Sequence, residues 1–88
     1  MKVTKSDVMA FLVERYATVF HQRSLDVGKI PESFDIFQEG IVDSFGIMEL
    51  LTAIEEEYGR PIDYETLPAE QLTRIGTLSE FVSGKLNE

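Results

Sequence analysis

The sequence predicts an all-α fold, a small four-helix bundle of three main helices and one short helix, with a long loop between the first two helices. Apolar residues recur at helical spacing in separate stretches of the chain, and capping residues, glycines and prolines divide those stretches. The chain has 88 residues, of which 43% are apolar, so residues 1–88 are expected to form one domain around a single core.

The first helix is expected to span about Thr4 to Gln22. It carries an apolar stripe at helical spacing, with two further apolar residues at its edge: Val8, Leu12, Tyr16 and Val19, then Met9 and Phe20. Phe11 falls off this stripe, and we expect it to meet the long loop. The sole histidine, His21, falls opposite the stripe near the helix end, and we interpret it as an exposed side chain favoured by the helix dipole rather than as a base or a ligand.

The connection from Arg23 to Val42 is long for a compact domain, and loops of this length are often functional. Glycine and proline interrupt it, and a short turn of helix is an option near Pro31–Phe34. We expect it to cross the bundle, because it contains too many apolar side chains to remain in water: Leu25, Ile30, Phe34, Ile36, Phe37 and Ile41.

The second helix begins after Asp43 or Ser44, since either side chain suits an N-cap, and it runs to Tyr58, before Gly59. Its predicted core face consists of Ile47, Leu50, Leu51, Ile54 and Tyr58, and we expect Leu50, Ile54 and Tyr58 to pack against the first and last helices. The opposite face holds Ser44, Phe45, Met48, Glu49, Thr52, Glu55 and Glu56. An apolar pair ringed by acids indicates a docking surface, and the alternative is that Phe45 and Met48 reach sideways into the core.

Past Gly59, Pro61 predicts an extended segment. Pro68 to Leu72 is expected to form the short third helix, anchored with its surroundings by Ile62, Leu67, Leu72 and Ile75. The Thr77–Glu80 pair matches a capping box and predicts a fourth helix over about 78–86, which Gly84 weakens near its end. Its inward residues are expected to be Leu78, Phe81, Val82 and Leu86.

The formal net charge is −8, from sixteen acidic and eight basic residues. Such a balance disfavours binding to nucleic acids and anionic membranes, and favours partners with basic patches; the alternative is that it only keeps the protein soluble. The chain has no cysteine, no apolar run of about 20 residues and no N-terminal signal core, so we expect a cytoplasmic protein without membrane insertion.

Catalytic machinery is not evident from the sequence. A nucleophilic serine needs a nearby base, and His21 belongs to a different helix from Ser44. The Gly-x-Ser-x-Gly pattern is missing because Val42 stands at its first position. Consecutive Glu55, Glu56 and Glu57 diverge by about 100° around a helix and cannot chelate one ion. We therefore predict neither an enzyme nor a metal site, and interpret the glutamates as a solvated face.

Asp43-Ser44, an apolar residue, and then Met48-Glu49-Leu50 on a helix resemble the Asp-Ser-Leu motif and following helix of acyl carrier and peptidyl (aminoacyl) carrier proteins. Together with chain length and acidity, the resemblance covers nearly the whole chain. It implies that Ser44 carries a covalent 4′-phosphopantetheine arm, whose thiol holds an acyl or aminoacyl group as a thioester in fatty acid or secondary metabolite biosynthesis. Asp43 would assist attachment by helping to hold metal and cofactor in the modifying enzyme.

The resemblance also implies partners: a phosphopantetheinyl transferase, an acyl- or aminoacyl-loading ligase, and downstream transferases or synthases with basic docking patches. They would meet the partner surface of Phe45, Met48, Glu49, Thr52, Glu55 and Glu56 on a monomeric, free-standing carrier. The rival interpretation is an unmodified acidic adaptor that binds a partner protein through this same helix face.

The sequence departs from the fatty-acid type of the family. Ile41 stands where that type has glycine, with Gly40 one residue earlier, and Phe45 replaces the usual Leu or Met. These features are closer to stand-alone aminoacyl, D-alanyl or peptidyl carriers. Gly46 costs about 0.5–1 kcal/mol of helix stability relative to alanine, and we expect it to leave space beside the arm.

Overall fold

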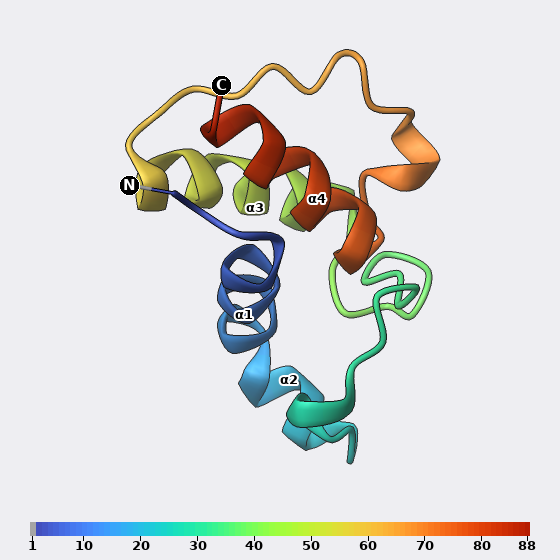
Figure 1. The fold of residues 1–88 in the computed structure, drawn as a ribbon. Helices are drawn as coiled ribbons and strands as arrows, with labels where there is room; N and C mark the ends of the chain where they lie inside the picture. Colours follow the sequence, from blue (N-terminus) through green and yellow to red (C-terminus); the bar gives the residue numbers. More distant parts are fainter. Residues whose placement is uncertain (1) are drawn as a thin grey trace.

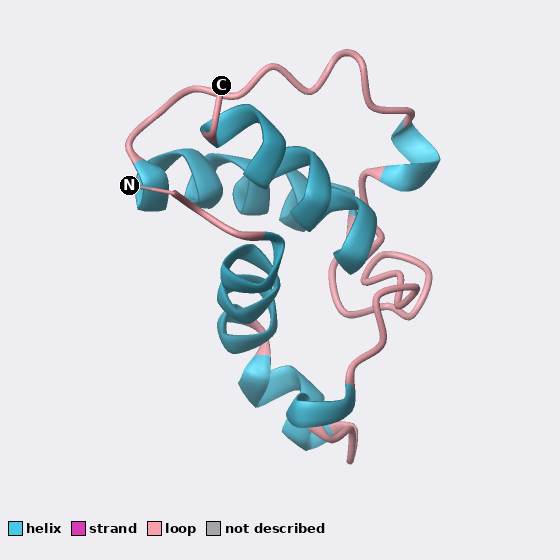
Figure 2. Ribbon diagram, in the orientation of Figure 1, coloured by secondary structure: helices cyan, strands magenta, loops and turns pink. Residues whose placement is uncertain are grey.

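The computed structural model describes residues 2–88, which form helices joined by loops with no strand among them (Figures 1 and 2). The α-helices are α1 (Lys5–Arg15), α2 (Ala17–Gln22), α3 (Ser44–Tyr58) and α4 (Ile75–Leu86). Two short 3₁₀ helices, η1 (Val27–Lys29) and η2 (Ala69–Gln71), lie within the connections. The all-α prediction is confirmed, including the long loop that precedes α3.

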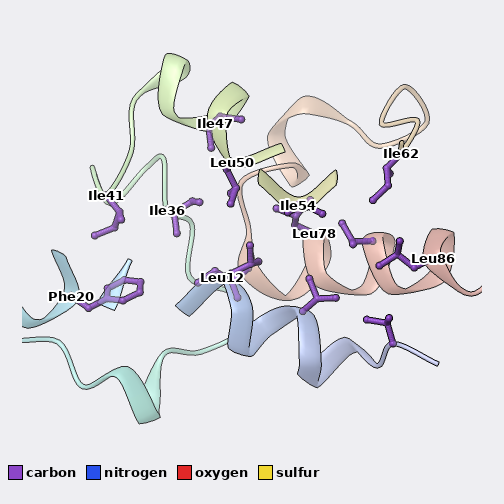
Figure 3. Close-up of a cluster of buried hydrophobic side chains, with 14 residues drawn as sticks. Leu12, Phe20, Ile36, Ile41, Ile47, Leu50, Ile54, Ile62, Leu78 and Leu86 are labelled. Carbon is purple, nitrogen blue, oxygen red and sulfur yellow. The ribbon is translucent and has the colours of Figure 1, made fainter. Parts of the chain in front are cut away.

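The core is formed where α1, α3 and α4 meet, and the most extensive backbone contact is between α1 and α4. In Figure 3, Leu12 of α1, Leu50 and Ile54 of α3 and Leu78 of α4 point into one cluster. Hydrogen bonds connect Val3 with Asn87, far apart in the sequence. The Asn87 side chain accepts from the Val3 amide at 3.1 Å and donates to the Val3 carbonyl at 2.7 Å. The buried apolar residues are Val3, Val8, Leu12, Phe20, Ile36, Ile41, Ile47, Leu50, Ile54, Ile62, Ile75, Leu78, Val82 and Leu86.

The single helix expected over 4–22 is two helices that break at Tyr16, whose φ of −108° and ψ of 14° leave the helical region. The predicted start is right, because Thr4 and Asp7 form a capping box. The break redirects the chain so that Phe20, expected at the edge of the stripe, is fully buried and packs edge-on against Phe34 at 5.6 Å. Phe11 packs on Tyr58 of α3 at 6.0 Å, not on the loop.

The last helix begins at Ile75, three residues before the expected start, and the Thr77–Glu80 capping box is wrong. Arg74 is the N-cap and makes no side-chain cap bond. The first amides of α4 are instead satisfied by the long loop, since Ile75 donates to the Phe34 carbonyl at 3.0 Å and Gly76 donates to the Glu32 carbonyl at 2.8 Å. Backbone groups distant in sequence therefore cap this helix.

The remaining connections differ from expectation in detail. The option of a helical turn at 31–34 is realised only as a hydrogen-bonded turn from Pro31 to Phe34, and the 3₁₀ helix lies earlier, at Val27–Lys29. The short third helix is a 3₁₀ turn over Ala69–Gln71 rather than an α-helix over 68–72. The segment after Gly59 is extended as predicted and runs around the outside of the bundle (Figure 1).

Candidate functional site

The start of α3 presents Ser44 to solvent. Asp43 is the N-cap, and its carboxylate accepts a hydrogen bond from the Gly46 amide at 2.7 Å. Ser44 is the first helical residue, and its side chain is exposed. Of the two capping candidates, Asp43 takes the role, so the Ser44 hydroxyl is not used to cap the helix.

Gly46 does not leave open space at this site. A Cβ at this position would lie 3.0 Å from the Val42 Cβ and 3.3 Å from the Asp43 carboxylate oxygen. The expectation of free room beside Gly46 is therefore wrong. Glycine here allows the chain before α3 to lie close to the first turn, which brings the capping carboxylate onto the Gly46 amide.

The loop before α3 is held by specific hydrogen bonds. Arg23, after the end of α2, donates from its two terminal nitrogens to the carbonyls of Glu39, at 2.6 Å, and Gly40, at 2.9 Å. Gly40 has φ of +74°, a left-handed turn that glycine adopts without strain. The carbonyl of buried Ile36 accepts the amides of Ile41 and Val42. This fixed turn leads the chain directly into Asp43 and Ser44.

A second segment lies against this turn and forms a groove with it. Ile36 donates its amide to the Thr73 carbonyl at 3.0 Å, and residues Asp35 and Arg74 form an antiparallel bridge. The groove of about 650 Å³ beside Ser44 is lined by Asp35, Phe37, Gln38, Ser44, Ile47, Ala69, Glu70, Leu72, Thr73 and Arg74. Sequence reasoning missed the second wall, because an isolated bridge between residues this far apart leaves no periodic pattern.

The carboxylate of Asp35 orders the first wall of the groove by accepting the amides of Phe37 and Gln38, each at 3.0 Å. Partial burial would raise the pKa of Asp35, but these two amides, the Thr73 side chain and the charge of Arg74 outweigh burial and lower it. Asp35 is therefore ionised at neutral pH, with much of its charge taken up by the turn.

Phe45 and Met48 lie on the outside of α3, not sideways in the core, with 71% and 64% of their surfaces exposed. They line a shallow groove of about 440 Å³ with Arg15 of α1 and with the polar residues Glu49, Thr52 and Glu56. This arrangement brings together five of the six residues expected on the partner surface.

Glu55 is the exception. Its side chain is half-buried, and its carboxylate accepts the Ile62 amide at 2.6 Å. It ties the extended segment after Gly59 to α3, so we remove Glu55 from the docking surface.

His21 lies on α2 with its side chain exposed. Residues 2–88 contain no group of three or more His, Cys, Asp and Glu side chains placed to hold a metal ion. Nor does any described helix combine the length and apolar character needed to cross a membrane.

One stretch of this chain is similar to a known carrier protein. Over 34 residues it is 50% identical to the D-alanyl carrier protein of Bacillus velezensis (strain DSM 23117 / BGSC 10A6 / LMG 26770 / FZB42). The match covers 39% of this chain and 44% of that protein, so it spans less than half the length of the curated relative. No family model matches the sequence. No solved structure matches it either. The match supports a relationship to carrier proteins and nothing more specific.

Proposed function

We propose that this chain is a phosphopantetheine-dependent carrier protein, not an enzyme, with Ser44 as the attachment point. The observation that carries the proposal is that Asp43 and Ser44 have different roles at the start of α3. Asp43 makes the helix cap, while the hydroxyl of Ser44 faces solvent at the rim of a groove. An exposed serine that the fold does not need for capping is a suitable substrate for another protein's active site.

The residues around Ser44 fit the proposed group. A phosphodiester on Ser44 would lie at the N-terminal end of a 15-residue helix, where the helix dipole favours an anion. The arm extending from it could lie along the groove against Phe37, Ile47 and Leu72, which supply apolar surface. When bound, the group supplies a thiol that carries acyl or aminoacyl cargo as a thioester. The chain's own part is to position that arm and present it to other proteins.

The outer face of α3 is the proposed docking surface for partner enzymes in the cytoplasm. Phe45 and Met48 give it an apolar centre, and Glu49 and Glu56 flank them with negative charge. A basic patch on a transferase, loading ligase or synthase complements this arrangement, and opposite charges would raise the rate of encounter. Asp43, next to Ser44 in sequence, would assist attachment at the transferase.

The proposed cargo is a small aminoacyl group. The relative's name refers to a D-alanyl group, and the groove beside Ser44 carries the exposed carboxylate of Glu70, which suits the protonated amine of an aminoacyl thioester. Competition between aminoacyl- and octanoyl-charged forms in a downstream transferase assay tests this. Preferential use of the octanoyl form would overturn the cargo assignment and leave the carrier role standing.

The decisive experiment is the intact mass of the purified protein before and after incubation with coenzyme A and a broad-specificity phosphopantetheinyl transferase. We expect the mass to rise by one phosphopantetheine group, and we expect Ser44→Ala to fold normally without any increase. A folded wild-type protein that stays unmodified with several transferases would refute the carrier proposal.

The exposure of Phe45 and Met48 also favours a second candidate, an unmodified adaptor that uses this face to bind a partner helix. One variant separates the candidates, and a second tests the helix face that both would use. Ser44→Ala would leave the activity of an adaptor intact and abolish that of a carrier, while the double variant Phe45→Ala/Met48→Ala would impair both.

A further inference from the structure

The groove beside Ser44 contains one guanidinium group. Arg74 lines the same groove as Ser44, and its side chain is exposed. Within residues 2–88 the ion pairs join Lys5 to Glu32 and Glu80, and Lys85 to Glu88, so the Arg74 side chain is not held in any of them. It is the only lysine or arginine among the residues that line this groove.

The backbone of Arg74 is fixed with respect to α3. It is paired with Asp35 in the antiparallel bridge, and it is the N-cap of α4. Backbone hydrogen bonds also hold the residues on both sides of Arg74. The Ile36 amide donates to the Thr73 carbonyl and the Ile75 amide donates to the Phe34 carbonyl, each at 3.0 Å. A long side chain on a fixed backbone can reach into the groove without deforming the fold.

The charges of the groove make Arg74 distinctive. Its two carboxylates, Asp35 and Glu70, would repel an anion placed on Ser44. The carboxylate of Asp35 is largely compensated, because it accepts two backbone amides and one side-chain hydrogen bond from Thr73, and the nearby charge of Arg74 is the smallest contribution to its lowered pKa. Among the residues that line the groove, Arg74 therefore supplies the positive charge that would attract the phosphodiester. Its planar guanidinium can donate hydrogen bonds to two phosphate oxygens at once.

We propose that Arg74 binds the phosphodiester formed on Ser44 and thereby directs the phosphopantetheine arm into the groove between α3 and the 69–74 segment, away from the Phe45–Met48 face. This inference rests on the proposed function. Arg74 is here a positioning residue: it acts on the anchored end of the arm and does not touch the thiol that carries the cargo.

The test compares apo and modified forms of four variants in thermal unfolding and in two-dimensional amide NMR. Arg74→Gln removes the proposed contact, and Arg74→Lys keeps its charge. Glu70→Gln removes a negative charge from the same groove. Arg15→Gln is the matched control, because it makes the same charge change in the groove beside Phe45 and Met48. Intact mass confirms that each protein is modified before it is compared.

In the wild-type protein, modification is expected to raise the melting temperature and to shift the amide resonances of Phe37, Leu72 and Thr73. Arg74→Gln should reduce that increment by about 1–4 °C and weaken the shifts, as expected for an exposed charge pair in a domain of this size. Arg74→Lys should retain most of the effect, and Glu70→Gln should increase it. The difference between wild type and Arg74→Gln should shrink at about 1 M salt.

Two results would overturn the inference. Equal losses in Arg74→Gln and Arg15→Gln would show that only overall charge matters, and no loss in Arg74→Gln would show that the phosphodiester does not use this residue. Both leave the carrier role intact, because the mass increase is measured separately. Failure of the wild-type protein to gain mass would instead remove the proposed function, and this inference with it.

Discussion

Replacement of Gly76 by alanine provides a stringent test of how the long loop holds α4. Gly76 is buried in the first turn of α4, and its amide donates to the Glu32 carbonyl at 2.8 Å. A Cβ at this position would meet the Glu32 Cβ and would lie 3.0 Å from the Glu32 carbonyl oxygen. Neither atom is the free end of a flexible side chain, so the loop itself would have to move.

The matched control is Gly84→Ala in the same helix. A Cβ on Gly84 meets nothing within 4 Å, and the position is exposed. Alanine there should stabilise the protein by about 0.5–1 kcal/mol through helix propensity alone. At Gly76 the same gain is opposed by overpacking, which costs about 1–3 kcal/mol. Because propensity enters both variants, their difference of about 1–3 kcal/mol isolates the contact with Glu32.

The assay is urea and thermal unfolding followed by far-UV circular dichroism, with both variants measured beside the wild-type protein. We expect Gly84→Ala to melt above wild type and Gly76→Ala to melt below Gly84→Ala, with a separation of about 4 °C or more. Equal stabilisation by the two substitutions would show that the loop does not press on α4, and would refute this account of the helix start.

Three further predictions concern the individual side chains of Asp43, Tyr64 and Asp35. Asp43→Asn keeps a side chain that can cap, so unfolding free energy should stay within about 0.5 kcal/mol while loading by the transferase slows; Asp43→Ala should also lose about 1 kcal/mol, as denaturation curves would reveal. The hydroxyl of Tyr64 is buried without a hydrogen-bond partner, and burial with the nearby Glu55 charge raises the pKa of Tyr64 to about 12. Tyr64→Phe should therefore leave stability unchanged or slightly higher, and a marked loss would mean that the hydroxyl has a partner. The pKa of Asp35 is lowered from its ordinary value of 3.8 in the folded state, so its contribution is present above that pH and is lost as pH falls through the folded value. In acid titrations, the stability difference between wild type and Asp35→Asn should be constant above about pH 4 and should narrow as the pH falls further, and parallel curves down to the lowest pH would exclude this linkage.

The sequence by itself determined α3 and the identity of the candidate site. Residues 44–58 agree with the prediction at both ends, because a capping aspartate and a left-handed Gly59 are local signals that act within one turn. The core positions Ile47, Leu50 and Ile54 follow from helical spacing, and so does the exposure of Phe45 and Met48 on the opposite face. Helical spacing did not predict the half-buried position of Glu55, because the amide that donates to its carboxylate belongs to Ile62, in the segment after the helix.

The tertiary structure alone decided how the long loop is used. Periodicity could not show the break at Tyr16 that turns Phe20 into the core, nor the early start of α4, because both depend on partners distant in sequence. The bridge between Asp35 and Arg74 is of the same kind. It joins two segments without any repeating pattern of their own, and so creates the groove beside Ser44. Local signals specify where a helix can begin, whereas backbone pairing across the fold determines which groups face a site.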